Sequence, residues 1–406
     1  MVWAYGLGWI MSNRIDHAQL SLTIVSPTNI GGPEKLTTKD YMYNYDASEV
    51  YLLNNYEWFR FLARHNKLAE FEIYMQNEMV RPNGRTMYDW AKNAIGASQL
   101  TKDVLGPAIG SIIKSSIYNE GRKNSLNDIT PQIRGANGDV YIPGSSIKGV
   151  IDSAIISHML RRDTRFRETV QQKLKGILYK YRDFQYDKRR CKREISSVLQ
   201  EVNKLIDYNI QVLFRNSEKR VNGILASAFR GIFVSDAMPM STIQTEVLKK
   251  EDSCIDEDGT HAISVHRECI LPNQKFSFTL TLDTAMTKEI GITNVNQVLD
   301  ILQEDFDATH KLLASKFKKV SPSVFKALES ANAYIGSNTG FIQKTVIMAA
   351  FTDDEKTGID IIRAILDVNF SKAKHDIKDK IMAPRALNLV KWNGHYYEMG
   401  GIHIGR

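Results

Sequence analysis

Two stretches in which apolar and polar residues alternate predict strands that lie far apart in the chain. Residues 19–25, QLSLTIV, alternate and end in a turn at Ser26-Pro27. Residues 276–283, FSFTLTLD, place apolar side chains on one face and hydroxyl or carboxyl side chains on the other. This alternation is typical of an antiparallel sheet that has one covered face.

Helical spacing dominates much of the remaining chain. From Ser146 onward, apolar residues recur at three- and four-residue intervals, which predicts an amphipathic helix with Ser145 or Ser146 as its N-cap. Further mostly helical patterns cover residues 57–118, 161–214 and 294–319. Shorter strand-like runs cover residues 140–142, 232–234 and 261–269. The mixture predicts an α+β fold.

Three glycine-rich loops carry the most suggestive chemistry. The first holds Gly31 and Gly32, the second is PGSSIKG at residues 143–149, and the third is GSNTGFIQK at residues 336–344. The second and third loops each run into a predicted helix, where unpaired backbone N–H groups and the positive end of the helix dipole attract anions. Lys148 and Lys344 add a positive charge to these loops. The loops therefore predict phosphate binding.

Neither loop matches a nucleotide-binding motif. In the second loop Lys148 precedes the second glycine, and no Ser or Thr follows it to bind magnesium, which disfavours hydrolysis of a nucleoside triphosphate. The third loop lacks the dinucleotide pattern G-x-G-x-x-G. Its Phe341 either stacks on a base, as in proteins that bind single strands, or is the first core residue of the next helix. A purely structural turn remains the alternative for the second loop.

Positive charge is concentrated in one segment. The chain carries 53 Lys and Arg against 46 Asp and Glu, a net charge of +7. Residues 161–195 alone hold thirteen basic and five acidic residues, a net of +8, which leaves the rest near −1. This segment predicts either a docking surface for a polyanion or a solvated helix face.

Metal and catalytic motifs are weak. Three cysteines without paired spacing predict a reducing compartment rather than a disulfide framework. The spacing of Cys254, His261, His266 and Cys269 matches no common zinc module, so we expect no metal and no other cofactor. We predict no catalytic residue, although His17 or His158 would suffice as the base for metal-free RNA cleavage.

The start of the chain is apolar but too short to span a bilayer. Residues 1–10, MVWAYGLGWI, also lack the basic region of a signal peptide, and no later run reaches the length of a membrane span. Met11 is an alternative start to Met1. We expect a cytoplasmic protein with no membrane partner.

Several motifs together resemble a known family. The segment NGDVYIPGSSIKGVI at residues 137–151 resembles the signature of the RAMP superfamily of CRISPR effector subunits. GSNTGF at residues 336–341 resembles its C-terminal glycine-rich loop, and FRGIFVSDA at residues 229–237 resembles a recurring strand end. Residues 24–36 and 395–401 narrow the resemblance to the fifth-subunit family of the type III-A (Csm) complex, which caps the crRNA 3′ end.

The resemblance implies two ferredoxin-like (RRM-like) domains with antiparallel sheets, glycine-rich loops and large helical insertions. We place the first domain at residues 1–216, with insertions at about 57–130 and 161–214, and the second at residues 217–406. The implied function is to bind crRNA and to support its 3′ maturation in antiviral defence without cutting RNA. The implied partners are crRNA, target RNA, neighbouring RAMP backbone subunits of the Csm complex and host nucleases that trim crRNA.

The motifs, the basic segment and the resemblance together give a set of expected RNA-binding residues. These are Gly31, Gly32, Arg134, Gly144, Ser145, Ser146, Lys148, Gly149, Arg161, Arg162, Lys188, Arg189, Arg190, Gly336, Ser337, Asn338, Thr339, Gly340, Phe341 and Lys344. Asp152 departs from the family pattern, because many members have Arg there, and we expect it to pair with a nearby cation.

Two other functions share the same motifs. A metal-independent RAMP endoribonuclease that processes precursor crRNA needs a His or Tyr near the scissile phosphate. A backbone subunit that cuts target RNA through a loop Asp needs a metal ion and two free faces for stacking. The large helical insertions disfavour the second alternative.

Overall fold

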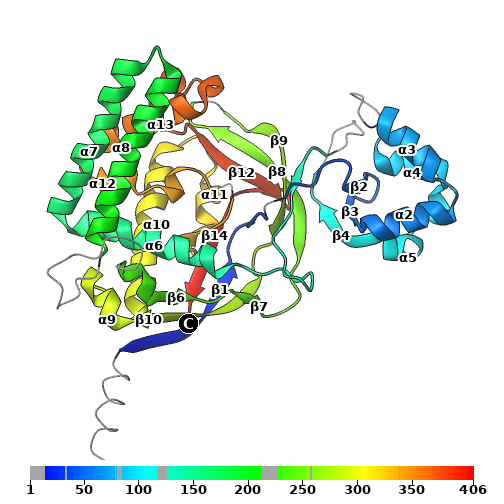
Figure 1. The fold of residues 1–406 in the computed structure, drawn as a ribbon, viewed down its shortest axis with the longest axis horizontal. Helices are drawn as coiled ribbons and strands as arrows, with labels where there is room; N and C mark the ends of the chain where they lie inside the picture. Colours follow the sequence, from blue (N-terminus) through cyan, green and yellow to red (C-terminus); the bar gives the residue numbers. More distant parts are fainter. Residues whose placement is uncertain are drawn as a thin grey trace, which may run out of the picture.

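The structure is a computed structural model that describes residues 14–32, 34–77, 79, 85–117, 126–211, 227–256, 258–337 and 339–406. A large body carries a smaller arm, drawn in blue and cyan at the right of Figure 1. Three features discussed above lie outside the described residues: the pair of alternative starts, the boundary between residues 216 and 217, and Asn338.

The two strands predicted from alternation are direct neighbours in the first sheet. β1 (Ile15–Ile24) pairs antiparallel with β10 (Lys275–Asp283), with Leu20 opposite Phe278. The strand order is β11-β14-β1-β10-β6. The other members are β6 (Ile232–Val234), β11 (Ala333–Tyr334), β14 (Gly401–Gly405) and β7 (Met238–Pro239), which pairs with β10.

Two helices cover one face of this sheet. They are α6 (Gly144–Arg162) and α10 (Val295–Lys316), which contact each other as well as the strands. Ile147, Ile151 and Val298 form a core with the apolar face of β10, whose Phe276 and Phe278 are buried as predicted. Asn294 caps α10 by accepting a hydrogen bond from the N–H of Gln297. The covered face predicted from alternation is therefore confirmed.

The second sheet connects the body to the arm. Its main path runs β13-β12-β8-β4-β3-β2, with β9 on β8 and β5 on β9. Its strands are β2 (Tyr41–Asn44), β3 (Glu49–Leu53), β4 (Ile109–Ser115), β5 (Ile129–Thr130), β8 (Thr245–Cys254), β9 (His261–Ile270), β12 (Ala386–Trp392) and β13 (His395–Glu398). Both sheets take strands from each side of residue 216, so neither sheet corresponds to one half of the chain.

Short helices pack on the arm around an aromatic core that includes Trp58, Phe71 and Trp90. The elements of the arm are α2 (Asn55–Arg64), α3 (Leu68–Asn77), α4 (Met87–Ala94), η1 (Ala97–Gln99), α5 (Lys102–Leu105) and η2 (Gly106–Ala108). The mostly helical pattern predicted through residue 118 is wrong after Ala108, because β4 follows there. Gly106 and Pro107 end the helical run, and the short apolar stretch after them joins a sheet.

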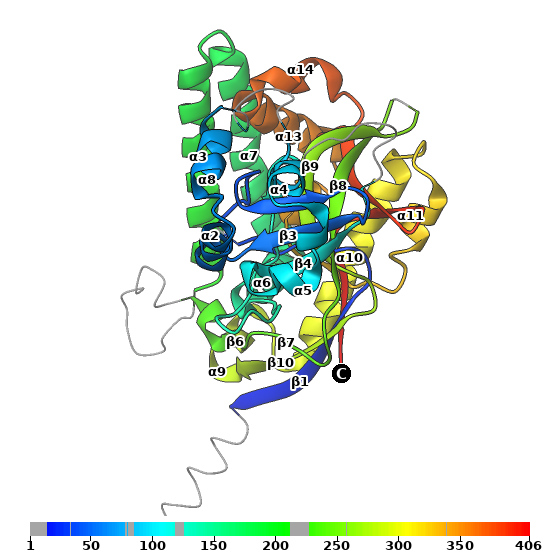
Figure 2. The same ribbon diagram turned by 90° about the vertical axis from the view of Figure 1, so that its right-hand side faces the viewer.

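A layer of long helices forms the edge of the body opposite the arm (Figures 1 and 2). α7 (Thr164–Phe184) and α8 (Lys188–Asn209) pack against each other and against α13 (Glu355–Asn369). The helices predicted within residues 161–214 are thus confirmed for the described part. The remaining short elements are η4 (Ala228–Gly231), α9 (Thr284–Thr287), η5 (Lys288–Ile290), α11 (Pro322–Lys326), η6 (Ile342–Lys344), α12 (Ile347–Ala350), η7 (Ser371–Ala373) and α14 (His375–Lys378).

Among the described helices, none is both long enough and apolar enough to cross a membrane.

Candidate nucleic-acid interface

The N-terminus of α6 is capped by a side chain from a distant segment of the chain. The prediction that Ser145 or Ser146 caps this helix is wrong, because α6 begins at Gly144 and its cap residue Pro143 offers no side-chain hydrogen bond. The Gly144 N–H instead donates to Asp236 Oδ1 over 2.7 Å. A carboxylate here also balances the positive end of the helix dipole. The segment before it, residues 140–142, forms isolated bridges rather than the predicted strand, because Val140 pairs with Arg134 and Ile142 with Ala237.

Lys148 has an internal role in this structure. Its Nζ donates to the carbonyl oxygens of Phe229 and Ile232, each over 2.6 Å. These bonds tie the first turns of α6 to the start of β6. The ammonium group predicted to move freely toward a phosphate is therefore engaged with the backbone.

Asp152 lies one turn further along α6. Burial raises its pKa to about 6, and the positive charge of Lys148 opposes that shift. The buried Oδ1 of Asp152 has no hydrogen-bond partner among the described residues. Lys148 is thus the cation that acts electrostatically on Asp152, without a direct hydrogen bond.

The two glycines of the second loop, Gly144 and Gly149, have different surroundings. A Cβ on Gly144 would lie 2.4 Å from the carbonyl oxygen of Val234, so the fold requires glycine there. A Cβ on Gly149 would meet nothing within 4 Å. Gly149 lies exposed on α6 and lines the cavity described next. Packing therefore explains Gly144 but leaves Gly149 unexplained.

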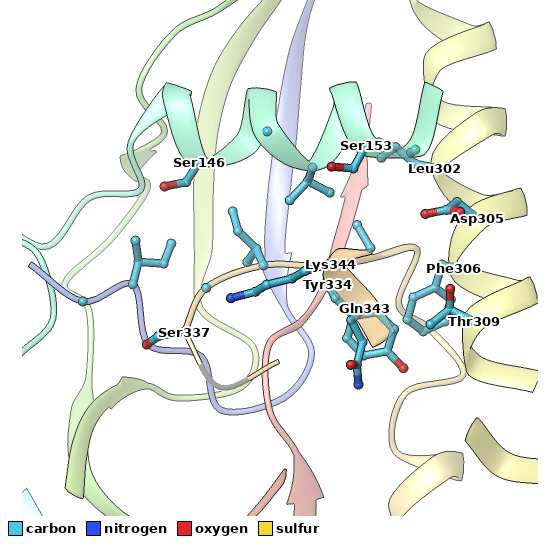
Figure 3. A pocket seen from close by; sticks show the side chains of 18 residues that line it. Ser146, Ser153, Leu302, Asp305, Phe306, Thr309, Tyr334, Ser337, Gln343 and Lys344 are labelled. Atoms are coloured by element: carbon cyan, nitrogen blue, oxygen red, sulfur yellow. The ribbon is translucent and has the colours of Figure 1, made fainter. Parts of the chain in front are cut away.

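The three predicted glycine-rich loops meet at one cavity of about 440 Å³ (Figure 3). It lies between α6, α10 and the loop that follows β11. The predicted residues that line it are Gly31 of the first loop, Ser146 and Gly149 of the second, and Gly336, Ser337 and Lys344 of the third. Side chains from three distant parts of the chain thus share one surface.

Backbone hydrogen bonds join the first and third loops. The Ser337 N–H donates to the Asn29 carbonyl over 2.8 Å, and the Ser337 hydroxyl bonds to Asn29 as well. Gly336 has φ +96°, and a Cβ there would lie 2.4 Å from the Asn29 carbonyl oxygen. This close approach requires glycine at position 336.

Arg267 on β9 is a cation at these loops that the sequence analysis missed. Its Nη1 donates to the Ser337 hydroxyl over 3.1 Å and lies 3.4 Å from Asn29 Oδ1. Its Nε is buried without a hydrogen-bond partner among the described residues. Strand alternation in residues 261–269 places Arg267 on the face opposite His266. The sequence alone does not show that this face lies beside the third loop, so the alternation did not identify Arg267 as a binding residue.

Arg267 and Lys344 repel each other. The pKa of Lys344 is lowered, first by partial burial and second by the charge of Arg267. Burial also lowers the pKa of Arg267. No Asp or Glu of the described chain forms an ion pair with either cation. Lys344 lines the cavity and Arg267 donates to the lining residue Ser337, so these two cations without an acidic partner favour binding of an anion at this end of the cavity.

The other end of the cavity is acidic. Asp305 on α10 lines it and accepts a hydrogen bond from Arg161 Nη2 over 2.7 Å. Arg161, expected to bind RNA, is thus held in an ion pair in which its side chain is 16% exposed. Phe306 and Tyr334 form part of the wall, with ring centroids 4.8 Å apart.

Other expected RNA-binding residues lie elsewhere. Arg134 forms an ion pair with the fully buried Glu268. Phe341 packs against the helical core, as the structural alternative predicted. Thr339 is buried, and Gly340 has φ +92°.

The cations of the basic segment do not line the cavity. The exposed ones among the predicted residues are Arg162, Lys188, Arg189 and Arg190. Arg190 also lies over the Phe184 ring, 4.3 Å from its centroid. The exposed cations of the segment therefore lie apart from the glycine-rich loops, at the end of α6 and at the start of α8.

The weak metal and catalytic candidates gain no support. No three His, Cys, Asp or Glu side chains of the described residues gather as a metal site. His158 bonds through Nδ1 to Glu304 over 2.8 Å, and His17 lies exposed on β1 opposite Thr281. Neither histidine lines the cavity.

The structure is a mixed fold of helices and antiparallel sheets, with glycine-rich loops that meet at one cavity. No protein-family model matches the chain. The chain is 24% identical to "CRISPR system Cms protein Csm5" of Mycobacterium tuberculosis (strain CDC 1551 / Oshkosh), over 97% of this chain and 98% of that protein. It is 21% identical to the Streptococcus thermophilus protein of the same name, over 96% and 97% respectively.

Solved structures share the fold. A chain of the cryo-EM structure of a Csm–crRNA–target RNA ternary complex matches with a TM-score of 0.64 and 18% identity, covering 95% of this chain and 99% of that one. The crystal structure of T. onnurineus Csm5 matches with a TM-score of 0.57 and 15% identity, covering 94% and 99%. The resemblance to the fifth subunit of the type III-A Csm complex, predicted from the sequence, is confirmed.

Proposed function

We propose that this chain is the crRNA-binding fifth subunit of a type III-A Csm effector complex, which caps the 3′ end of the crRNA and supports its maturation. One observation carries the proposal: three glycine-rich loops from distant parts of the chain line one cavity, which Lys344 also lines and whose lining residue Ser337 accepts a hydrogen bond from Arg267. The end-to-end similarity to Csm5 proteins supports it.

The loop chemistry suits an RNA backbone. Lys344 and Arg267 supply charge, and the Ser146 hydroxyl supplies a short-range hydrogen bond, whereas the Ser337 hydroxyl already donates to Asn29. Gly149 keeps the rim of the cavity free of a side chain, which lets a sugar–phosphate chain approach α6. Contacts of this kind position a nucleic acid without reading its sequence. RNA affinity therefore depends on salt and little on sequence.

The finer fold assignment is part of the proposal. The sheet order β14-β1-β10-β6, with α6 between β1 and β6 and α10 between β10 and β14, corresponds to a β-α-β-β-α-β ferredoxin-like unit. It combines the first strand of the chain with its last. The second sheet is proposed to be the other ferredoxin-like unit, with the arm and the α7–α8 pair as insertions.

The exposed cations of residues 161–195 are proposed to make further contacts with the complex. Lys188 and Arg189 are exposed at the start of α8, and Arg162 is exposed at the end of α6. Exposed cations suit contact with crRNA or with an acidic face of a neighbouring RAMP subunit. Target RNA and host nucleases that trim crRNA are further proposed partners. The protein is proposed to act in the cytoplasm.

The protein is proposed to act by binding rather than by cleavage. The experiment compares crosslinks from the assembled complex to crRNA for the wild type and for the double variant R267A/K344A. We expect wild-type crosslinks at the crRNA 3′ region and their loss in the double variant, while K318A, an exposed lysine outside the cavity, behaves as wild type. Absence of wild-type crosslinks at the 3′ region contradicts the proposal.

A second experiment distinguishes binding from catalysis. The isolated protein is incubated with repeat RNA in EDTA, where the proposal predicts intact RNA. Defined cleavage products would favour the metal-independent endoribonuclease instead.

A further inference from the structure

The cavity between α6 and α10 has two chemically different ends, as Figure 3 shows. Lys344 points toward Ser337 and Ser146 at one end, and Asp305 lies with Thr309 and Phe306 at the other. Arg267 reinforces the basic end through its hydrogen bond to Ser337. A ligand that spans the cavity therefore has Lys344 at one end and the Asp305 carboxylate at the other.

The acidic end disfavours a second phosphate. Asp305 is paired with Arg161, and its side chain remains 25% exposed. Burial raises the pKa of Asp305, which Arg161 and a hydrogen bond from Ser157 oppose. Arg161 offsets part of the charge of this carboxylate, whose remaining lone pairs accept hydrogen bonds from hydroxyl or amine groups but offer no donor to a phosphate. The Thr309 hydroxyl beside it adds a group that both donates and accepts.

The wall between the two ends is apolar. Phe306 and Tyr334 lie with their ring centroids 4.8 Å apart, and Leu302 and Ala154 continue the surface. The volume of about 440 Å³ lies within the range of about 300–1,000 Å³ that is typical of small-ligand sites. An apolar wall with few polar groups at defined places suits one sugar and base.

We infer that this cavity holds the terminal nucleoside of an RNA 3′ end, with its 5′-side phosphate at Lys344 and Arg267 and its free ribose hydroxyls at Asp305 and Thr309. The inference rests on the proposed function, which places the chain at the crRNA 3′ end. An internal nucleotide carries a second phosphate, which would have to pass Asp305. The cavity thus distinguishes a 3′-hydroxyl end from a 3′-phosphate end.

The test measures binding of the full chain to two short single-stranded RNAs of the same sequence, one ending in a 3′-hydroxyl and one in a 3′-phosphate. Fluorescence anisotropy reports the affinity, with the label at the 5′ end. The wild type is expected to bind the 3′-hydroxyl RNA at least about tenfold more tightly. Equal affinities would overturn the inference.

Asp305→Asn removes the charge while keeping the shape of the side chain. We expect the affinities of this variant for the two RNAs to differ by no more than about twofold. The main cause should be that 3′-phosphate RNA binds more tightly to the variant than to the wild type. Asp307→Asn is the matched control, because Asp307 lies exposed on the same helix, and it keeps the wild-type preference. An unchanged preference in Asp305→Asn would overturn the role of Asp305. If that variant does not fold, the wild-type comparison still decides the inference.

The two proposals fail in different ways. If crRNA 3′ crosslinks form in the assembled complex but the two RNA ends bind equally, only the terminal-nucleoside inference is wrong. If the crosslinks are absent and neither RNA binds, the proposed function fails and the inference fails with it.

Discussion

The guanidinium group of Arg267 donates from Nη1 to the hydroxyl of Ser337 over 3.1 Å, which connects β9 of the second sheet to the third glycine-rich loop beside the first sheet. The same loop carries Lys344, whose pKa is lowered by burial and by Arg267. The protein thus holds two repelling cations at one loop, a cost to stability that binding of an anion would relieve.

Lys344→Ala is expected to weaken RNA binding and to reduce its salt dependence. Loss of one contact to a single-strand phosphate lowers the slope of log K against log salt by about 0.7. Titrations at several salt concentrations measure this slope. Lys318→Ala is the control, as an exposed lysine outside the cavity. An unchanged slope in Lys344→Ala would show that Lys344 does not contact a phosphate.

Lys148→Ala is expected to affect folding more than RNA binding. The substitution removes two hydrogen bonds of an ammonium group to the carbonyls of Phe229 and Ile232. The free energy of unfolding should fall by about 2 kcal/mol, as urea denaturation measures it. The exposed Lys288 supplies the control Lys288→Ala. A large loss of RNA affinity at unchanged stability would instead return Lys148 to the role of a phosphate clamp.

Gly144→Ala and Gly149→Ala form a matched pair within one helix. The first is expected to destabilise the protein by several kcal/mol or to prevent folding, since its Cβ would lie 2.4 Å from the Val234 carbonyl oxygen. The second is expected to raise stability by about 0.5–1 kcal/mol, because alanine favours helix and nothing lies within 4 Å. Thermal unfolding measures both.

RNA binding gives the second readout for Gly149→Ala. The added methyl group narrows the rim of the cavity, so we expect a more stable protein that binds RNA more weakly. Unchanged affinity would mean that the RNA backbone does not approach α6 at this position.

Glu398→Gln is expected to change the pH dependence of stability. Burial raises the pKa of Glu398 from 4.5 to about 7, against the opposing hydrogen bonds from Gln343 and Tyr334. The folded state therefore favours the protonated form, whose stabilising contribution is complete below pH 4.5 and is lost as pH rises through about 7.

Urea denaturation across this pH range tests the shift. Glutamine stays neutral, so the variant should match the wild type near pH 4.5 and exceed its stability above pH 7, by about 3 kcal/mol at most. His266, whose pKa burial lowers to about 4, contributes in the opposite direction in both proteins, and the difference between them isolates Glu398. The exposed Glu329 gives the control Glu329→Gln. Parallel pH profiles for wild type and Glu398→Gln would contradict the shift.

The sequence predicted the elements whose signals are local. Alternation identified β10 and its buried face, and helical spacing identified α6 and α10. The error at β4 has a physical cause, because a short apolar run beside a helical region does not distinguish strand from helix until its partners are known.

The sequence also identified the three glycine-rich loops but not what each residue in them does. Lys148, Arg134 and Arg161 were expected at RNA, Lys148 as part of the second loop and Arg161 as part of the basic segment. Each instead has a partner from elsewhere in the chain: backbone carbonyls for Lys148, Glu268 for Arg134 and Asp305 for Arg161. Arg267 was missed because only tertiary pairing places β9 beside the third loop.

By itself the sequence determined the α+β class, the glycine-rich loops, the basic segment and the resemblance to a Csm subunit, since these depend on residue type and on spacing along the chain. Only the tertiary structure decided that the first strand pairs with β10 and β14, that three loops share one cavity, and which cations remain without an acidic partner. The reason is physical: whether a charge is free to bind a ligand depends on groups within a few ångströms, and those groups come from segments that lie far away in sequence.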